Sequence, residues 1–594
     1  MSEIMAGLKR TNYCGQLNIS DINKTVVVAG WVQRRRDLGG LIFIDLRDRS
    51  GIIQITIDEA KDKALFEKAC SLRNEYVLCA KGVLKERDKN TVNTKITTGE
   101  VELFVDELRI LSEAITPPFE IVEDCGTNEE LRLKHRYLDL RRPDMQNCII
   151  LRHKVAKITR DYFDSEGFLE IETPMLIKST PEGARDYLVP SRIQNGKFYA
   201  LPQSPQLYKQ LLMVAGFDKY MQIVRCFRDE DLRSDRQPEF TQIDLEMSFV
   251  DADDVMTVNE GFLAKAFEEA LGVKIEMPFL RLPYKEAMER FGSDKPDIRF
   301  GFELIDISDI VKDSGFKVLA DAISEGGSVR AVKIDGYADK ISRRDADSLT
   351  EFVKIFGAKG LLWVRNQNGE TTTSFTKNIT ESELKAITEK AGLKDNDLLF
   401  IIAGNDATVF DSLGALRCEI AKKLDLLKKD DYKFLWVNEF PLLEYDEDEK
   451  RFAAKHHPFT APMDEDILLL DTAPEKARAK AYDIILNGVE VGGGSLRIYS
   501  KELQSKMFKL LGLSEEEAQE KFGYLLSAFK YGVPPHGGLA FGFDRLLMLM
   551  AGKDSIRDVI AYPKIQNASE LMTSCPSDVD EKQLKELGLE IRKH

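Results

Sequence analysis

Residues 225–244 have the sequence RCFRDEDLRSDRQPEFTQID, a charged segment that begins directly after the apolar stretch MQIV and leads into another apolar stretch. It contains four arginines within twenty positions. A surface loop of ion pairs would explain this composition. Guanidinium groups can instead bind phosphate oxygens bidentately, and an aromatic ring such as Phe240 can stack on a purine. The segment therefore predicts a nucleotide site.

A second segment, residues 537–549 with the sequence GGLAFGFDRLLML, combines a run of small residues with a helix-like run. Glycines allow a ligand to approach the backbone closely, and the start of a helix together with Arg545 favours an anionic phosphate. The spacing of its glycines matches neither the dinucleotide fingerprint GxGxxG nor the P-loop pattern GxxxxGK[ST]. The pattern therefore indicates another kind of nucleotide fold.

Residues 1–116 contain five segments that alternate like β-strands, and a helix-like stretch, EAKDKALFEKACSL, lies between the third and the fourth. Five strands with a helix after the third are typical of an OB-fold, a barrel that often binds single-stranded nucleic acid. A purely structural barrel with a solvated arginine run would show the same alternation. The five segments are TVVVAGWVQ from Thr25, LIFIDLRD from Leu41, GIIQITI from Gly51, EYVLCAKGVL from Glu75 and EVELFV from Glu100.

A domain boundary is expected after the barrel, because the prolines of ITPPFEI from Ile115 interrupt regular structure. With 594 residues the chain is long enough for several domains. We predict a multidomain α+β protein with an N-terminal OB-fold barrel (1–116), a hinge (117–140), a catalytic domain in two parts (141–296 and 429–576), an inserted α/β domain (297–428) and a C-terminal extension (577–594).

The two segments quoted above resemble the second and third motifs of class II aminoacyl-tRNA synthetases, and GFLEIETP from Gly167 to Pro174 resembles the first. In that class the motifs lie on an antiparallel sheet, and the first builds a homodimer interface. The strings STPEGARDY, QSPQLYKQLL, HHPFT and NGVEVGGGSLRI resemble the bacterial aspartyl members of the aspartate, asparagine and lysine subgroup. The resemblance, which extends to the inserted domain, implies an aspartate–tRNA ligase with L-aspartate, ATP and tRNA(Asp) as substrates.

The resemblance implies an amino-acid pocket in which Lys209 and Arg497 hold the side-chain carboxylate of aspartate. Asparagine would place an amide NH₂ group against these cations, and lysine would be repelled by them. The full set of residues expected around aspartate is Glu182, Ser204, Gln206, Lys209, Asp244, His456 and Arg497.

For ATP, the resemblance assigns the α-phosphate to Arg228, the γ-phosphate to Arg545 and the adenine ring to Phe240, with Arg228 and Arg545 as the catalytic cations. Asp483 and Glu490 are expected to hold Mg²⁺ between phosphates. Without this context, two acids on a strand are more often ordinary surface charge. The further nucleotide contacts expected are Asp229, Glu230, Gln237, Glu490, Gly542, Phe543 and Asp544.

In the barrel, the resemblance implies that Phe43 stacks on an anticodon base while polar groups bond to base edges. Alternation alone would equally allow Phe43 to be buried. The residue after RRRD is often His in enzymes that also accept tRNA(Asn), and here it is Leu38, which predicts an enzyme selective for tRNA(Asp). The expected anticodon contacts are Arg36, Leu38, Phe43, Gln54 and Glu100.

Composition limits the other classes of function. The formal net charge of −16 argues against indiscriminate binding to nucleic acid, so DNA is not an expected partner and RNA must meet a local basic patch. The first residues have no apolar signal core and no apolar run could cross a bilayer, which predicts a cytoplasmic protein without a membrane partner. Two alternatives stay open, an asparaginyl-tRNA synthetase and an inert synthetase paralogue that binds RNA.

Overall fold

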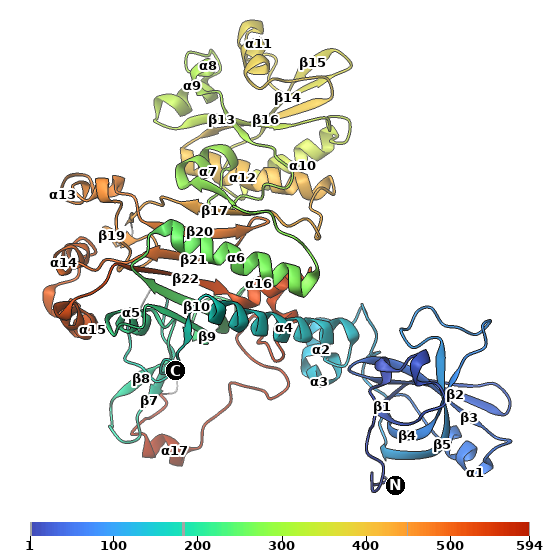
Figure 1. The fold of residues 1–594 in the computed structure, drawn as a ribbon. Coiled ribbons are helices and arrows are strands. Elements are labelled where there is room, and N and C mark those ends of the chain that lie inside the picture. The colour runs from blue at the N-terminus through green and yellow to red at the C-terminus, as the bar shows by residue number, and fades with distance from the viewer. Residues whose placement is uncertain (1–2, 181–183, 448, 593–594) are drawn as a thin grey trace. The chain divides into compact units, whose positions relative to one another are not determined.

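The structure is a computed structural model that describes residues 3–180, 184–447 and 449–592 (Figure 1). Its chain forms two compact units, which are described separately. The first comprises residues 1–151 with 557–578, and the second comprises residues 152–556 with 579–594. No helix in the described part of the chain has the length and apolarity needed to span a membrane.

The first unit contains a closed five-stranded barrel in the order β1-β2-β3-β5-β4. Alternate residues of its strands, among them Ile42, Ile44, Ile53 and Ile55, point into a fully buried core. The five predicted strands and the helix after the third are confirmed. Their bounds are β1 (Thr25–Asp37), β2 (Leu41–Asp48), β3 (Gly51–Asp58), α1 (Lys63–Cys70), β4 (Val77–Glu86) and β5 (Val101–Ser112), preceded by the 3₁₀ turns η1 (Cys14–Gln16) and η2 (Ile19–Asp21).

The predicted hinge, residues 117–140, is partly helical. It contains α2 (Glu129–Lys134) and α3 (Arg136–Asp139), and the carboxylate of Asp139 is fully buried. The Arg136 guanidinium bonds to Asp139 and donates to the backbone carbonyls of Ile560 and Ala561. These bonds connect α3 to the beginning of residues 557–578, which fall in the same compact unit as the barrel.

The second unit is built on an eight-stranded sheet in the order β11-β17-β20-β21-β22-β10-β9-β6. The pairs from β17 to β9 are antiparallel, as predicted for a class II catalytic domain, whereas the two outermost pairs, β11 with β17 and β6 with β9, are parallel. The strands are β6 (Leu169–Glu170), β9 (Lys219–Phe227), β10 (Glu239–Ser248), β11 (Leu280–Pro283), β17 (Phe434–Asn438), β20 (Ala481–Leu486), β21 (Val489–Leu496) and β22 (His536–Gly542).

Helices cover this sheet, and Figure 1 shows α6 lying across one face. Phe262 of α6 packs against Phe541 of β22, with ring centroids 5.4 Å apart. The helices of this layer and its surroundings are α4 (Pro143–Ser165), α5 (Gln206–Val214), α6 (Ala252–Leu271), α13 (Leu469–Thr472), α14 (Lys501–Leu510), α15 (Glu515–Ala528), α16 (Phe543–Met550) and α17 (Glu581–Glu586). Short elements complete it: hairpins β7 (Leu188–Pro190) with β8 (Phe198–Ala200) and β18 (Leu443–Asp446) with β19 (Arg451–Ala454), and turns η3 (Asp464–Asp466), η4 (Pro474–Lys476), η5 (Phe529–Tyr531) and η6 (Ile556–Asp558).

A separate five-stranded antiparallel sheet, in the order β12-β13-β16-β14-β15, lies within the range predicted for the inserted domain. The chain leaves the large sheet after β11 and returns at β17, which pairs directly with β11, so the segment between them is an insertion. It contains β12 (Leu304–Asp306), β13 (Ser328–Ile334), β14 (Leu362–Gln367), β15 (Glu370–Thr373), β16 (Asp397–Gly404), α7 (Tyr284–Phe291), α8 (Ser308–Val311), α9 (Lys317–Ser324), α10 (Arg343–Lys354), α11 (Glu381–Lys390) and α12 (Asp406–Lys423).

Candidate functional site

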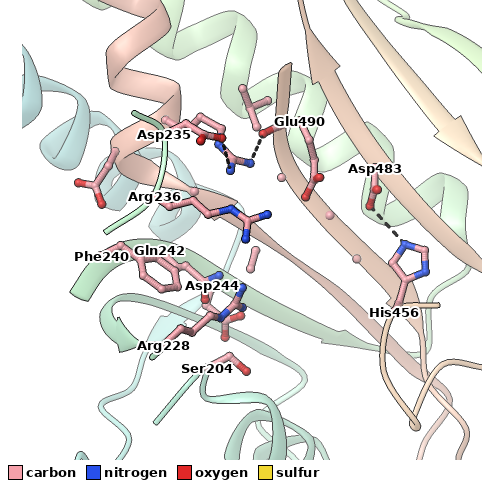
Figure 2. Close-up of a pocket in the computed structure, with 18 of the residues that line it drawn as sticks. Ser204, Arg228, Asp235, Arg236, Phe240, Gln242, Asp244, His456, Asp483 and Glu490 are labelled. Carbon is pink, nitrogen blue, oxygen red and sulfur yellow. Dashed lines mark hydrogen bonds and ion pairs between the residues drawn. The ribbon is translucent and has the colours of Figure 1, made fainter. Parts of the chain in front are cut away.

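A cavity of about 560 Å³ opens on the large sheet of the second unit, where residues of β10, β20, β21 and β22 line it. Its volume lies within the usual range of small-molecule sites. Figure 2 shows Ser204, Arg228 and Asp244 on one side of this cavity, and Asp235 and Glu490 on another. The cavity therefore brings together residues from segments that are far apart in the sequence.

A buried cluster of two cations and two acids lies at one end of the cavity, and three of its four residues line the cavity. Asp244 and Glu246 are two residues apart on β10, so the strand places both carboxylates on the same face. Lys209 of α5 and Arg497 after β21 face them, and all four side chains are at most 3 % exposed. The cluster is thus neutral in total, although each of its charges is removed from water.

Hydrogen bonds fix the positions of these four groups. Lys209 Nζ lies 2.6 Å from Asp244 Oδ1 and 3.3 Å from Glu246 Oε2. The Arg497 guanidinium binds both oxygens of Glu246, at 2.9 and 3.0 Å, and approaches Nε2 of His457 to 2.8 Å. Burial alone would raise the pKa of Glu246, but the charges of Arg497 and Lys209 outweigh it and lower that pKa to about 2. Glu246 is therefore ionised and orients both cations.

Three polar atoms of the cavity are left without a hydrogen-bond partner among the residues that the structure describes. They are Oδ2 of Asp244, Nε2 of Gln206 and Nδ1 of His456. A buried polar atom without a partner is costly, so such atoms mark places where a ligand is expected to bind. Here Asp244 offers a carboxylate oxygen, Gln206 an amide N–H donor and His456 a ring nitrogen to a small polar molecule.

The other end of the cavity contains arginines from the two segments singled out in the sequence. Arg228 lies over the Phe240 ring, 5.2 Å from its centroid, and Arg236 is paired with Glu230 at 2.7 Å. Arg545, in the first turn of α16, donates to the backbone carbonyl of Glu490 at 2.8 Å and to Asp235 at 3.1 Å. An aromatic face beside several guanidinium groups suits a nucleotide.

Asp483 and Glu490 converge on the wall of the cavity. The hairpin between β20 and β21 turns at Asn487 and Gly488, whose φ values of 54° and 81° are those of a type I′ turn. A Cβ placed on Gly493 would lie 2.4 Å from Asp483 Oδ1 and 3.8 Å from Glu490 Oε1, so this glycine leaves room for both carboxylates. Burial and the neighbouring charge of Asp483 raise the pKa of Glu490. Figure 2 also shows His456 facing Asp483, at 3.7 Å.

Comparison with known families identifies both a synthetase domain and an OB-fold domain in this chain. Residues 128–566 match the family model of the class II tRNA synthetases for D, K and N, and residues 26–111 match the OB-fold nucleic acid binding domain. The first match alone covers more than half of the chain. The chain belongs to the class II tRNA synthetases. The matched range includes both the arginine-rich segment 225–244 and residues 537–549.

Curated relatives resemble this synthetase over its whole length. It is 61 % identical to an aspartate–tRNA ligase of Ruminiclostridium cellulolyticum, with both chains covered completely. It is 58 % identical to an enzyme of Caldanaerobacter subterraneus subsp. tengcongensis named aspartate–tRNA(Asp/Asn) ligase, again with both chains covered completely.

Solved structures share the fold of the synthetase at low sequence identity. The asparaginyl-tRNA synthetase of Pyrococcus horikoshii with asparaginyl-adenylate has a TM-score of 0.59 at 19 % identity and covers 94 % of this chain and 98 % of its own. The aspartyl-tRNA synthetase of Entamoeba histolytica has a TM-score of 0.58 at 20 % identity, with coverages of 94 % and 92 %. At this identity, the likeness establishes the fold alone.

Most residues predicted from the sequence line the cavity of the synthetase. Phe543 is buried beneath Arg152, and Asp229 faces Arg185 at 3.7 Å, so neither is part of the lining. Glu182 lies outside the described residues. The predicted residues that line the cavity are Ser204, Gln206, Lys209, Arg228, Glu230, Gln237, Phe240, Asp244, His456, Asp483, Glu490, Arg497, Gly542, Asp544 and Arg545.

Several groups in or beside the cavity were missed by sequence reasoning. The spacing of Asp244 and Glu246 on one strand was a usable signal, because residues two apart share a face. His457, rather than His456, contacts Arg497, and both histidines line the cavity. Asp294 and Lys295, which precede the inserted domain, also line it, and no pattern in the sequence indicated them.

In the barrel of the synthetase, a row of polar side chains crosses the outer face of β1, β2, β3 and β5. Arg36 bonds to Asp45 at 2.8 Å and to Gln54 at 2.9 Å, and Gln54 bonds in turn to Glu102 at 3.0 Å. Phe43 is half-buried and alternates with the core residues of β2, so it belongs to this outer face. Predicted Glu100 is exposed just before β5, whereas Glu102, not predicted, is part of the row.

Proposed function

We propose that this synthetase activates L-aspartate with ATP and transfers the aspartyl group to the 3′ end of tRNA(Asp). The single observation that carries the choice of amino acid is the buried cluster of Lys209, Arg497, Asp244 and Glu246. The names of the curated relatives support the same choice.

In this proposal, Lys209 and Arg497 bind the side-chain carboxylate of aspartate. Glu246 holds both cations in place, and His457 supports Arg497. The unpartnered Oδ2 of Asp244 accepts from the ammonium group of the substrate, and Gln206 donates an amide N–H. Ser204, Glu182 and His456 complete the proposed amino-acid site. Asparagine would leave donors facing donors, and mismatches of this kind separate substrates by about 10⁴ to 10⁵.

The other end of the cavity is proposed to bind ATP, with Phe240 stacking on adenine, Arg228 at the α-phosphate and Arg545 at the γ-phosphate. Attack of the aspartate carboxylate on the α-phosphorus releases pyrophosphate and concentrates negative charge, which the arginines stabilise. No protein nucleophile takes part. The remaining proposed nucleotide contacts are Asp229, Glu230, Gln237, Glu490, Gly542, Phe543 and Asp544.

Asp483 and Glu490 are proposed to hold Mg²⁺. Their carboxylates converge over Gly493, and no group of three or more His, Cys, Asp or Glu side chains suited to a metal is found in the part of the chain that the structure describes. Two carboxylates fit Mg²⁺, which usually takes its other ligands from water and from substrate phosphates. The ion would neutralise charge on the phosphates of ATP.

The barrel is proposed to bind the anticodon of tRNA(Asp) on its outer face, where Phe43 stacks on a base. Arg36, Gln54, Glu100 and Leu38 are proposed to contact the anticodon loop, and the hydrogen-bonded row adds Glu102 as a candidate. The formal net charge of −16 makes this local site necessary, because the chain as a whole repels RNA.

A second copy of the chain is proposed to cover the edge of the large sheet. The edge strand is β6, within the predicted first motif, and edge strands present unpaired backbone groups. Nearby apolar side chains such as Leu169, Leu176 and Phe217 are about half exposed. Sedimentation of the purified chain at the mass of a dimer would support this assignment, and a monomer would refute it.

Amino-acid-dependent exchange of pyrophosphate into ATP tests the proposed activity. We expect exchange with aspartate and none with asparagine or lysine, followed by charging of tRNA(Asp). Exchange with asparagine alone would identify an asparaginyl enzyme. Absence of exchange with every amino acid would identify an inert paralogue, a reading that the presence of Arg228, Phe240, Glu490 and Arg545 in the cavity disfavours.

A further inference from the structure

Asp294 and Lys295 enter the cavity from the segment that leads into the inserted domain, and the proposed reaction gives them no role. Lys295 Nζ lies 2.9 Å from Asp294 Oδ2 and 3.6 Å from Glu490 Oε2. Its side chain is 37 % exposed and so retains freedom to move. A lysine is ordinarily cationic at neutral pH, so this end of the cavity contains an additional positive charge beside the proposed metal-binding carboxylates.

The backbone around Lys295 is held firmly from the side of the inserted domain. Arg417 of α12, which is 1 % exposed, donates to the carbonyl oxygens of Asp297 at 2.8 Å and of Phe302 at 3.1 Å. A Cβ on Gly414 of α12 would lie 2.3 Å from the carbonyl oxygen of Gly292. The longest helix of the insertion is therefore packed directly against the segment that carries the lysine.

The same segment also touches the hairpin of Asp483 and Glu490. A Cβ on Gly488, in the turn of that hairpin, would lie 3.1 Å from Cβ of Asp297. The segment that carries Lys295 thus packs against both α12 of the insertion and the β20–β21 hairpin of Asp483 and Glu490. These contacts fix its backbone in place. A cation held at such a position can attract an anionic ligand that binds beside Asp483 and Glu490.

We propose that Lys295 binds the pyrophosphate end of ATP and helps to hold pyrophosphate as it leaves, an inference that rests on the proposed function. In the described structure its ammonium group is paired with Asp294 and Glu490. When Glu490 takes part in metal binding, its attraction for Lys295 falls, and the ammonium can donate to a phosphate oxygen beside the metal. The lysine forms no covalent bond and acts through charge and hydrogen bonding alone.

In this proposal the inserted domain contributes to the reaction, because its helix α12 positions the segment that carries Lys295. The competing explanation is that Lys295 forms an ordinary ion pair that only orients Glu490. An orienting lysine would affect metal binding, whereas a phosphate ligand must also affect the affinity for pyrophosphate itself. Measurements with each ligand separate the two roles.

The test compares Lys295→Met, Lys295→Arg and a matched control, Lys480→Met, in the full chain. Lys480 is also partly buried and paired with an aspartate, Asp464, at 2.7 Å, but it does not line the cavity. Calorimetry at a fixed excess of Mg²⁺ gives the Kd of ATP and of inorganic pyrophosphate, and exchange kinetics give the KM of aspartate. Melting curves establish that each variant is folded, and Lys295→Gln replaces Lys295→Met if the latter does not fold.

For Lys295→Met, we expect the Kd of ATP and of pyrophosphate to rise about tenfold or more, while the KM of aspartate changes less than about twofold. Lys295→Arg should recover most of this loss, and Lys480→Met should match the wild type. Unchanged affinity for both ligands, an equal loss for aspartate, or an arginine variant no better than the methionine variant would overturn the inference. Absence of aspartate-dependent exchange in the wild type would instead refute the proposed function, and the two binding measurements would still test the lysine.

Discussion

The four charges of Lys209, Arg497, Asp244 and Glu246, at the end of the cavity proposed for the amino acid, depend on one another. Lys209 and Arg497 neutralise the carboxylates of Asp244 and Glu246 in a place from which water is excluded. A buried ion pair adds little net stability, but removal of one partner leaves an uncompensated charge and is strongly destabilising. Each cation therefore serves the fold as well as the proposed aspartate site, and its removal should affect both.

Replacing Lys209 with Met, or Arg497 with Leu, should lower kcat/KM for aspartate in pyrophosphate exchange by about 10² to 10³-fold or more. The reason is that each change removes one of the two cations proposed to face the substrate carboxylate. The same changes should lower the melting temperature, because Asp244 or Glu246 loses its partner. Exchange must accordingly be measured below the melting temperature of each variant.

Lys480→Met is the control for this prediction, since it removes an ion pair of the same unit outside the cavity. It should leave exchange unchanged. Near-normal use of aspartate by a folded Lys209 or Arg497 variant would show that the carboxylate binds elsewhere.

His457 makes the stability of the second unit depend on pH. Burial, followed by the charge of Arg497, lowers the pKa of His457 well below 6.5. Below about pH 6.5 the unfolded chain binds a proton at this residue and the folded chain does not, so the folded state loses stability as the pH falls. The loss amounts to about 1.4 kcal/mol per pH unit until the folded pKa is reached.

The variant His457→Gln should remove this contribution, so that its melting temperature falls less between pH 7 and pH 5 than that of the wild type. His153→Gln, which changes an exposed histidine, should follow the wild type. Melting curves across the pH range provide the measurement. Parallel pH profiles for the wild type and His457→Gln would contradict the prediction.

At the scale of elements, strands were predictable where one face is buried and the other is not. The alternation of β2 indicated which of its residues enter the barrel, and the observed bounds of β2 and β3 agree with the predicted segments. The two parallel pairs at the edges of the large sheet were not predictable, because β6 and β11 are two and four residues long. Strands this short carry too little periodicity to indicate a partner or its direction.

The β2 strand also resolves the position of Phe43, for which alternation alone allowed two faces. Phe43 lies on the outer face, so Phe43→Ala should weaken the charging of tRNA by about 1 to 3 kcal/mol, the usual contribution of one stacked base. Adenylate formation should be unchanged, because the cavity belongs to the other compact unit. Charging kinetics and pyrophosphate exchange, measured side by side, check both parts.

Ile19→Ala serves as the control for Phe43, because Ile19 is an exposed apolar residue of the same unit in η2, outside the barrel strands. It should leave charging unchanged. Equal loss of charging and of exchange in Phe43→Ala would indicate instead that the barrel collapses and disturbs the whole chain.

The parts of the site that sequence reasoning missed are those that depend on distant contacts. Glu246 binds Arg497 across 251 residues of sequence, and no local pattern joins them. Lys295 lies in the cavity only because the chain enters and leaves the insertion beside the large sheet. Glu100 and Glu102 are only two residues apart, but Glu100 precedes β5, whereas Glu102 lies in β5 and bonds to Gln54.

At the scale of the whole molecule, the two compact units divide the proposed work between them. The second contains the cavity for the amino acid and ATP, and the first contains the barrel proposed to bind the anticodon. Selection of the amino acid and selection of the tRNA therefore depend on residues in different units. Substitutions in the barrel should change which tRNA is charged without changing which amino acid is activated.

Whether the molecule charges tRNA(Asp) alone is not decided by overall similarity. The relative from Ruminiclostridium cellulolyticum is named as an aspartate–tRNA ligase and the one from Caldanaerobacter as an aspartate–tRNA(Asp/Asn) ligase, at 61 % and 58 % identity. The two anticodons differ at the third base, so the difference should depend on a few residues of the barrel. Leu38 is the candidate, because it follows RRRD in the turn between β1 and β2.

Leu38 does not cover apolar barrel surface, since its side chain is 69 % exposed while its backbone N–H bonds to the carbonyl of Leu41 at 3.0 Å. Leucine offers no hydrogen bond to the wrong third base, so kcat/KM should be about tenfold or more higher for tRNA(Asp) than for tRNA(Asn). Leu38→His supplies a hydrogen-bonding group at this position and should narrow that ratio, chiefly by improving the charging of tRNA(Asn). Aspartylation of the two transcripts measures both ratios, with Ile19→Ala as the control. Comparable kcat/KM values for the two transcripts in the wild type would show that this molecule accepts both tRNAs and that Leu38 does not exclude one.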